Sequence, residues 1–241
     1  MAGARSANAK PPPAMPGGMI RTIAIAATLA ILPLAALVPT PAGAQFAELV
    51  RQRAEGWEIG PFYKGRSRSP GMPARAVQAG DTAYFDFPWP DARAGHVHYV
   101  TRPTGPLTGA REIVLRYRID GERGVRFHPQ EHPDRKATLS LYFQRRGDNW
   151  KARGRYATYR WYAPEGMMGP VTPGTHEVRV PLDANWVAVL GATSHTAPGA
   201  FADALDNAAR VGFVFGSRGG RGHGVYATAP ARFTILDFRV E

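Results

Sequence analysis

Residues 208–216 read AARVGFVFG, and residues 231–240, which follow a glycine-rich turn, read ARFTILDFRV. In the first segment Phe213 and Phe215 alternate with Arg210 on the opposite side. An apolar alternation of period two is typical of a strand with one buried face. We therefore expect Phe213 and Phe215 in the core and Arg210 exposed.

The second segment changes phase along its length. Phe233 and Ile235 share one face, whereas Leu236, Phe238 and Val240 fall on the other. Such a change predicts either a β-bulge or a strand covered on both sides. A strand this apolar is expected at the centre of a sheet, with earlier strands beside it.

Residues 1–44 have the pattern of a secretory signal peptide. The segment is basic without any acidic residue, contains an apolar run over residues 23–38, and ends in Ala42-Gly43-Ala44. The pattern predicts cleavage after Ala44 and export to the periplasm or medium. A membrane anchor is the alternative, but Pro33 interrupts the run.

The remainder has the size of a single sandwich domain without disulfides. Cleavage would leave 241 − 44 = 197 residues, and the chain has no cysteine, so the core alone must stabilise the fold. The whole chain has a formal charge of +11. A basic exported protein suits acidic polysaccharide, anionic lipid or nucleic acid, although arginines scattered over the surface give the same total.

Residues 45–79 are expected to form a short helix followed by an irregular connector. Phe46, Leu49, Val50 and Trp57 fall at helical spacing, and glycines and prolines dominate residues 60–73.

Residues 80–241 are expected to form an all-β antiparallel jelly-roll sandwich. One short helix is predicted over residues 200–207, before the penultimate strand. The other expected strands, separated by turn residues, cover 82–87, 96–100, 111–119, 138–144, 156–162, 176–182 and 186–189.

Three segments resemble a known family. They are GPLTG at 105–109, WVAVL at 186–190 before FADAL at 201–205, and GVYATAPARFTI at 224–235. In this order they resemble galactose-binding-like jelly rolls, the fold of many carbohydrate-binding modules and of complex I intermediate-associated proteins. The resemblance implies carbohydrate binding and a structural calcium ion, without transferring any single ligand residue.

Polar positions opposite the apolar ones form a candidate binding face. Arg116, Arg118, Tyr142 and Gln144 share this phase in their strands. If the two strands belong to one sheet, these side chains lie together. Aromatic rings stack on sugars, and arginine and glutamine hydrogen-bond hydroxyls or carboxylates.

Three aromatic residues are added to this candidate site: Trp150, in a turn, and Tyr159 and Trp161, from one side of the strand that follows. Arg160 and Tyr162 point to its other side. The alternative is that Tyr159 and Trp161 are core residues.

The histidines are weaker evidence for a functional site than the arginine and aromatic residues above. His96 and His98 share a strand face, and His128 and His132 flank Glu131. Imidazole and carboxylate suit zinc, but the spacing alone does not assign a metal site.

The sequence favours an exported, non-catalytic carbohydrate-binding protein with no nucleic-acid partner and no membrane contact after cleavage. There is no cysteine and no Gly-x-Ser-x-Gly motif, so a nucleophilic enzyme is disfavoured. Two alternatives stay open: a jelly-roll lyase acting on acidic polysaccharide, and a structural protein without a small ligand. The single RGG-like fragment at 218–222 is weak support for RNA contact, and no pattern assigns a cofactor or an oligomeric state.

Overall fold

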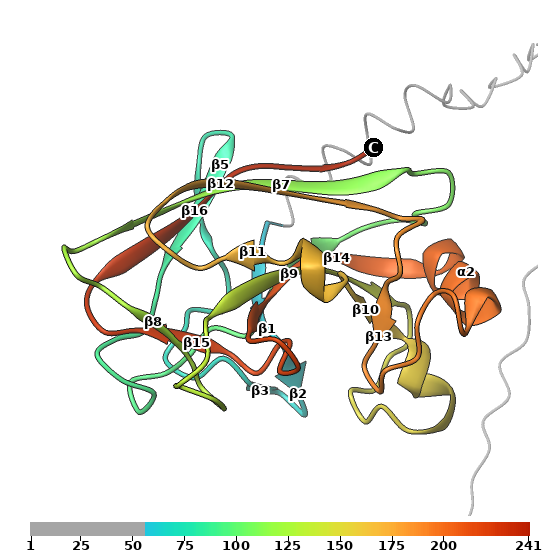
Figure 1. Ribbon diagram of the computed structural model, residues 1–241, viewed down its shortest axis with the longest axis horizontal. Coiled ribbons are helices and arrows are strands. Elements are labelled where there is room, and N and C mark those ends of the chain that lie inside the picture. Colours follow the sequence, from blue (N-terminus) through green and yellow to red (C-terminus); the bar gives the residue numbers. More distant parts are fainter. Residues whose placement is uncertain (1–55) are drawn as a thin grey trace, which may run out of the picture. The chain divides into compact units, whose positions relative to one another are not determined.

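The computed structural model describes residues 56–241, which form a sandwich of two antiparallel sheets with a shared core (Figure 1). The seven-stranded sheet consists, in spatial order, of β1 (Glu58–Gly60), β6 (Tyr99–Pro103), β14 (Ala208–Gly216), β9 (Thr138–Arg145), β10 (Arg160–Tyr162) and β13 (Val187–Ala188), with β11 (Gly169–Pro170) paired to β9. The five-stranded sheet consists of β12 (Gly174–Pro181), β7 (Glu112–Gly121), β16 (Ala231–Val240), β5 (Thr82–Asp86) and β4 (Val77–Ala79).

Short elements complete the described part of the chain. The small strand pairs are β2 (Phe62–Tyr63) with β3 (Arg66–Ser67), and β8 (Phe127–Pro129) with β15 (Val225–Ala227). The helices are α2 (Pro198–Asp206) and the 3₁₀ turns η1 (Gly154–Thr158) and η2 (Glu165–Met167). None of the helices within residues 56–241 is long and apolar enough to cross a membrane.

The strand order is that of a jelly roll. The eight main strands in chain order are β5, β6, β7, β9, β10, β12, β14 and β16. One sheet contains the first, third, sixth and eighth of these strands (β5, β7, β12 and β16), in the spatial order β12-β7-β16-β5. The other sheet contains β6, β9, β10 and β14, in the spatial order β6-β14-β9-β10. This interleaving makes two Greek keys. The predicted all-β jelly-roll sandwich is confirmed, as is a helix directly before β14, the penultimate strand of the eight.

The core is built on the strands formed by residues 208–216 and 231–240. Phe213 and Phe215 are fully buried, as predicted. Phe213 stacks on Phe233 of the opposite sheet with ring centroids 5.2 Å apart, and Phe233 stacks on Phe85 of the neighbouring strand at 5.2 Å. Strand β14 therefore fixes the packing distance between the sheets.

The phase change in the last segment is a β-bulge. The register of β16 against β7 shifts between Ile235 and Asp237, so Leu236 is the extra residue. Phe233, Ile235 and Phe238 consequently all belong to the core. The predicted bulge and the central position of β16 are both confirmed.

Three expectations need correction. Arg210 is half-buried rather than exposed, because its Nη2 lies 3.0 Å from Glu58 Oε1 on β1. Part of the expected connector is strand, since β1 pairs with β6 and β4 pairs with β5. The expected strand over residues 156–162 is shorter, because residues 154–158 form η1. The helix expected within residues 45–79 lies, apart from Trp57, outside the described residues.

Candidate ligand-binding site

The outer face of the seven-stranded sheet carries a second, aromatic cluster. Tyr99, Tyr142, Tyr162 and Val214 come from four adjacent strands and are all buried. They alternate with the core residues of the same strands, which places them on the opposite face. The rings of Tyr99 and Tyr142 pack edge to face at 5.1 Å, and the hydroxyls of Tyr99 and Tyr162 are 2.8 Å apart. The outer face of this sheet is therefore covered, and these four side chains are not exposed to solvent.

Two loops cover this cluster. In the first, Trp150 has a positive φ of 64° and packs its ring against Tyr99 at 5.3 Å. In the second, the glycine-rich loop after β14, the carbonyl oxygen of Gly222 accepts a hydrogen bond from Nδ1 of His98 at 2.7 Å. Together the two loops leave an opening above the tyrosines.

The opening is a cavity of about 460 Å³ that we call the cationic cavity. Its lining contains four permanently charged cations and, among the residues described, no acidic one. The cations are Arg68, Lys151, Arg160 and Arg221. The remaining lining residues are Pro61, Tyr63, His98, Tyr99, Trp150, Tyr162, Val189, Gly222 and His223.

A buried network holds Arg160 at the cavity. Its side chain is 7% exposed, and its Nε lies 3.1 Å from Oδ2 of Asp148, whose side chain is fully buried. Gln144 donates from Nε2 to the same oxygen at 2.9 Å. The guanidinium also lies 5.0 Å from the ring of Trp150. A buried ion pair whose carboxylate also accepts a hydrogen bond fixes the position of both charges.

Several polar atoms of this network have no hydrogen-bond partner among the described residues. The donors among them are Nε and Nη2 of Arg160, Nε of Arg221 and the hydroxyl of Tyr142, and two acceptors, Oε1 of Gln144 and Oδ1 of Asp148, are also without a partner. A buried unpaired polar group costs free energy unless water or a ligand satisfies it. Donors of this kind beside a cavity are typical of a site that receives an acceptor.

The electrostatics of the site favour an anion. Burial raises the pKa of Tyr99 and Tyr142 well above the usual value, and burial likewise raises the pKa of Tyr162. These hydroxyls therefore stay protonated at neutral pH and do not offset the arginines. Burial alone would disfavour the Arg160 cation, but the neighbouring tyrosines and Asp148 outweigh it and raise its pKa.

His98 supports the glycine-rich loop rather than acting as a free base. Burial, followed by the neighbouring His96, lowers its pKa to about 4, so the ring is neutral near pH 7. Nδ1 must carry the proton in order to donate to the Gly222 carbonyl oxygen. Nε2 therefore accepts from Nδ1 of His96 at 2.5 Å. Both ring nitrogens are occupied.

Arg116 and Arg118 are not part of this site. They lie on β7 of the five-stranded sheet, whereas Tyr142 and Gln144 lie on β9 of the other sheet. The prediction that the four are neighbours is wrong, because the jelly-roll connection places consecutive long strands in different sheets.

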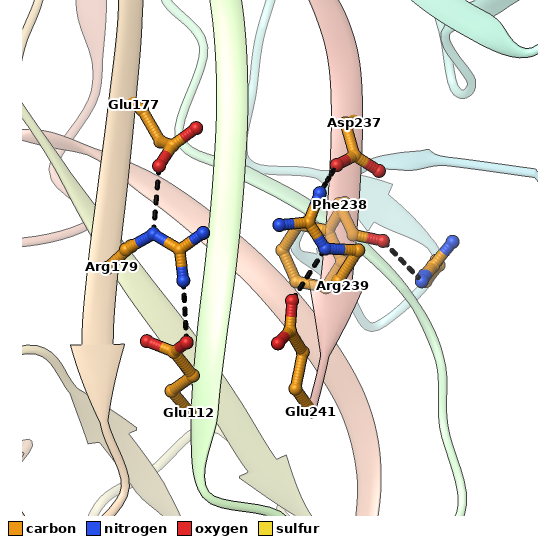
Figure 2. Close-up of polar contacts among 8 residues, drawn as sticks. Glu112, Glu177, Arg179, Asp237, Phe238, Arg239 and Glu241 are labelled. Carbon is orange, nitrogen blue, oxygen red and sulfur yellow. Dashed lines mark hydrogen bonds and ion pairs between the residues drawn. The ribbon is translucent and has the colours of Figure 1, made fainter.

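Arg116 and Arg118 belong instead to an ion-paired outer surface. Figure 2 shows part of it, where Arg179 bridges Glu177 and Glu112. Arg239 contacts Asp237 and Glu241 in the same way on β16. Arg118 pairs with Asp120 at 2.8 Å, and Arg116 lies in register between Glu177 and Asp237. Alternating charges of this kind suit a solvated face.

The remaining predicted site residues divide between the cavity and the core. Trp150 lines the cationic cavity, Gln144 supports it through Asp148, and Tyr142 forms the layer beneath it. Trp161 is fully buried in the main core against Phe201, so its assignment to the binding face is wrong. Tyr159 is buried beside Arg145 and lines none of the cavities described here.

The sequence interpretation therefore chose the wrong side of β10. Trp161 pairs in register with the core residue Phe143, whereas Arg160 and Tyr162 pair with Gln144 and Tyr142. The alternation did separate the two sides, but the sequence could not show which side faces the core. Arg221 and His98 were noticed in the sequence only as part of an RGG-like fragment and of a histidine pair, and neither pattern placed them at this site.

The described residues contain no cluster of the side chains that most often bind metal ions. Within residues 56–241, no group of three or more His, Cys, Asp or Glu side chains is placed to hold one. His128 instead bonds the Pro133 carbonyl oxygen and stacks on Tyr226. Calcium also takes backbone carbonyl oxygens as ligands, and the calcium ion implied by the resemblance stays a prediction.

Comparison with known proteins gives no match. No family model matches the chain, and no curated protein or solved structure is significantly similar to it. The jelly-roll topology is thus established by the strand order alone, and the resemblance to galactose-binding-like domains stays a prediction.

Proposed function

We propose that this protein is an exported, non-catalytic binding protein for an acidic carbohydrate, which it holds in the cationic cavity. The observation that carries the proposal is the lining: four cationic side chains and, within the described residues, no acidic one. The Arg160 and Arg221 side chains are only 7% and 13% exposed. Each also has a carboxylate partner outside the lining, Asp148 at 3.1 Å from Arg160 and Glu165 at 3.8 Å from Arg221, so a ligand would be a second acceptor for each guanidinium. A largely desolvated guanidinium binds a carboxylate or sulfate much more strongly than a surface cation does.

The aromatic neighbours favour a sugar as the carrier of the acidic group. Trp150 is half-buried at the cavity, and Tyr63 lines it from the β2–β3 hairpin. Aromatic rings offer apolar faces for the C–H side of a sugar ring, while polar groups fix its orientation. The signal-peptide pattern of residues 1–44 supports a role outside the cytoplasm, where acidic glycans are encountered.

A matched pair of ligands tests the proposal. Galacturonate and galactose differ at one position, where the first has a carboxylate and the second a hydroxymethyl group. We expect galacturonate to bind at least about tenfold more tightly, because the charge-assisted hydrogen bonds require the carboxylate. Equal affinities, or no binding of galacturonate, would overturn the proposal. Inorganic phosphate serves as a third probe, and binding of phosphate alone would assign the cavity to a simple anion.

Two variants locate the site. Arg221→Gln removes a cavity cation while keeping a polar side chain, and we expect it to weaken galacturonate binding about tenfold. Arg118→Gln makes the same change on the exposed face of the other sheet and should leave binding unchanged. If both variants bind like the parent protein, the cationic cavity is not the site.

One observation favours an enzyme as the second candidate. Nδ1 of His223, which lines the cavity, lies 2.8 Å from Oε2 of Glu131. A carboxylate that orients an imidazole leaves the other ring nitrogen available as a general base. A lyase of acidic polysaccharide would need such a base beside the carboxylate-binding arginines. Unsaturated product from polygalacturonate, lost in His223→Gln, would establish this function in place of pure binding.

A further inference from the structure

The cationic cavity has a neighbour across Trp150. A second cavity of about 290 Å³ is lined by parts of β1, β6, β9 and β14 and by the loop after β9. The two cavities share Pro61, Tyr99 and Trp150 in their linings. The indole ring of Trp150 thus stands between two hollows on the same sheet face.

The second cavity is also net positive. Its lining includes three arginines, Arg145, Arg146 and Arg210, against the two carboxylates Glu58 and Asp148. Two of the three arginines are already engaged, since Arg145 pairs with Asp203 and Arg210 pairs with Glu58. Arg146 is exposed and is therefore the cation best placed to meet a ligand there.

Trp150 is held firmly enough to serve as a platform between the two hollows. Its ring packs edge to face on Tyr99 at 5.3 Å and lies 5.0 Å from the Arg160 guanidinium. Both partners are buried and fixed by the sheet. A half-buried indole fixed from below presents its remaining surface to a ligand at little entropic cost.

We propose that the natural ligand is a linear acidic glycan that runs across Trp150, with one acidic group in each cavity, rather than a single acidic sugar. This inference rests on the proposed function and specifies its ligand class. In such a glycan, acidic groups alternate with the apolar faces of the sugar rings. The two cationic cavities would each bind an acidic group, and the Trp150 indole between them would pack against the sugar ring that joins the two groups. A single sugar would occupy only the cationic cavity.

The experiment compares galacturonate with its linear trimer and hexamer, using the parent protein and Arg146→Gln. We expect the hexamer to bind at least about tenfold more tightly than the monomer, because a second charged contact forms. Arg146→Gln should weaken hexamer binding and leave monomer binding unchanged. Arg221→Gln should weaken both. Arg153→Gln removes a nearby exposed arginine that lines neither cavity, and it should behave like the parent protein.

The outcomes separate this inference from the proposed function. Equal affinity for monomer and hexamer, or an unaltered hexamer affinity in Arg146→Gln, would overturn the two-cavity ligand while leaving monomer binding intact. Absence of binding for all three sugars would overturn both. A single-stranded oligonucleotide of matched charge is the last control. Equal binding of it would mean that the groove recognises polyanions in general and would contradict the glycan assignment.

Discussion

Gly222 lies directly against the ring of Tyr99. A Cβ atom at Gly222 would be only 2.5 Å from the Tyr99 hydroxyl oxygen and 2.6 Å from Cε2. The glycine-rich loop therefore reaches the floor of the site only because it has no side chain at this point.

This contact predicts a difference between two glycines of the same loop. Gly219 and Gly222 have nearly equal positive φ values, 77° and 76°, but a Cβ at Gly219 would meet nothing closer than 3.7 Å. Gly219→Ala should lose about 1–2 kcal/mol of unfolding free energy from the backbone alone. Gly222→Ala should lose about 1–3 kcal/mol more from overpacking. Denaturant unfolding measures both variants, and equal losses would mean that the loop does not sit on Tyr99.

The shared core predicts a large effect at Phe213. Phe213→Ala should destabilise the protein by about 3–5 kcal/mol, because it empties the space between the stacked rings of the two sheets. The control is Arg118→Ala, on the exposed ion-paired surface, which should change stability by less than about 1 kcal/mol. Chemical denaturation of the pair tests the arrangement, and comparable losses would contradict the assignment of faces.

The lowered pKa of His98 predicts a pH-dependent stability. The ring has a pKa of about 4 when folded and 6.5 when unfolded, so the unfolded state binds more protons between these values. Stability should be complete above pH 6.5 and fall as pH decreases toward 4, by about 1–2 kcal/mol between pH 7 and 5.

Two variants separate this effect from other acid-sensitive groups. His98→Gln should show a shallower decline in unfolding free energy over this pH range, whereas His195→Gln, in an exposed loop, should keep the parent slope. A His98→Gln slope equal to that of the parent would rule out the buried imidazole as the cause.

Tyr142 combines a packing role with an unsatisfied hydroxyl. Tyr142→Phe should leave stability unchanged or raise it by up to about 1 kcal/mol, because it removes a buried group without a hydrogen-bond partner in the described structure. Tyr142→Ala should lose about 3–5 kcal/mol, because the ring packs against Tyr99 and Tyr162. Thermal melts distinguish the two, and a strongly destabilised Tyr142→Phe would show that the hydroxyl has a structural partner.

Alternation within single strands was the part of the fold that the sequence revealed most directly. It placed Phe213 and Phe215 in the core and gave a β-bulge as one of two explanations for the phase change in residues 231–240, where the structure has the bulge at Leu236. The pairing of strands is a long-range property, and alternation carries no information about it. Arg118 and Tyr142 have the same phase relative to their neighbours, yet they lie on the outer faces of different sheets, where Arg118 is exposed and Tyr142 is buried beneath two loops.

The candidate site was only partly predictable for the same reason. Trp150 and Gln144 were found by residue type and turn context, and both contribute to the site. Trp161 was misplaced because both faces of the seven-stranded sheet are covered with aromatic residues, so that an aromatic residue on β10 suits either face. Arg221 reaches the site by the path of a long loop, which strand periodicity does not describe.

The central position of β16 has a consequence for how the chain matures. The β7–β16 ladder joins Gly121 to Ala231 and Ile113 to Val240, so more than a hundred residues are synthesised between the two partners. Until then, β7 and β5 lack the strand that joins them in their sheet, and pairing across such separations is slow. The five-stranded sheet can therefore be completed only after residues 231–240 have been synthesised.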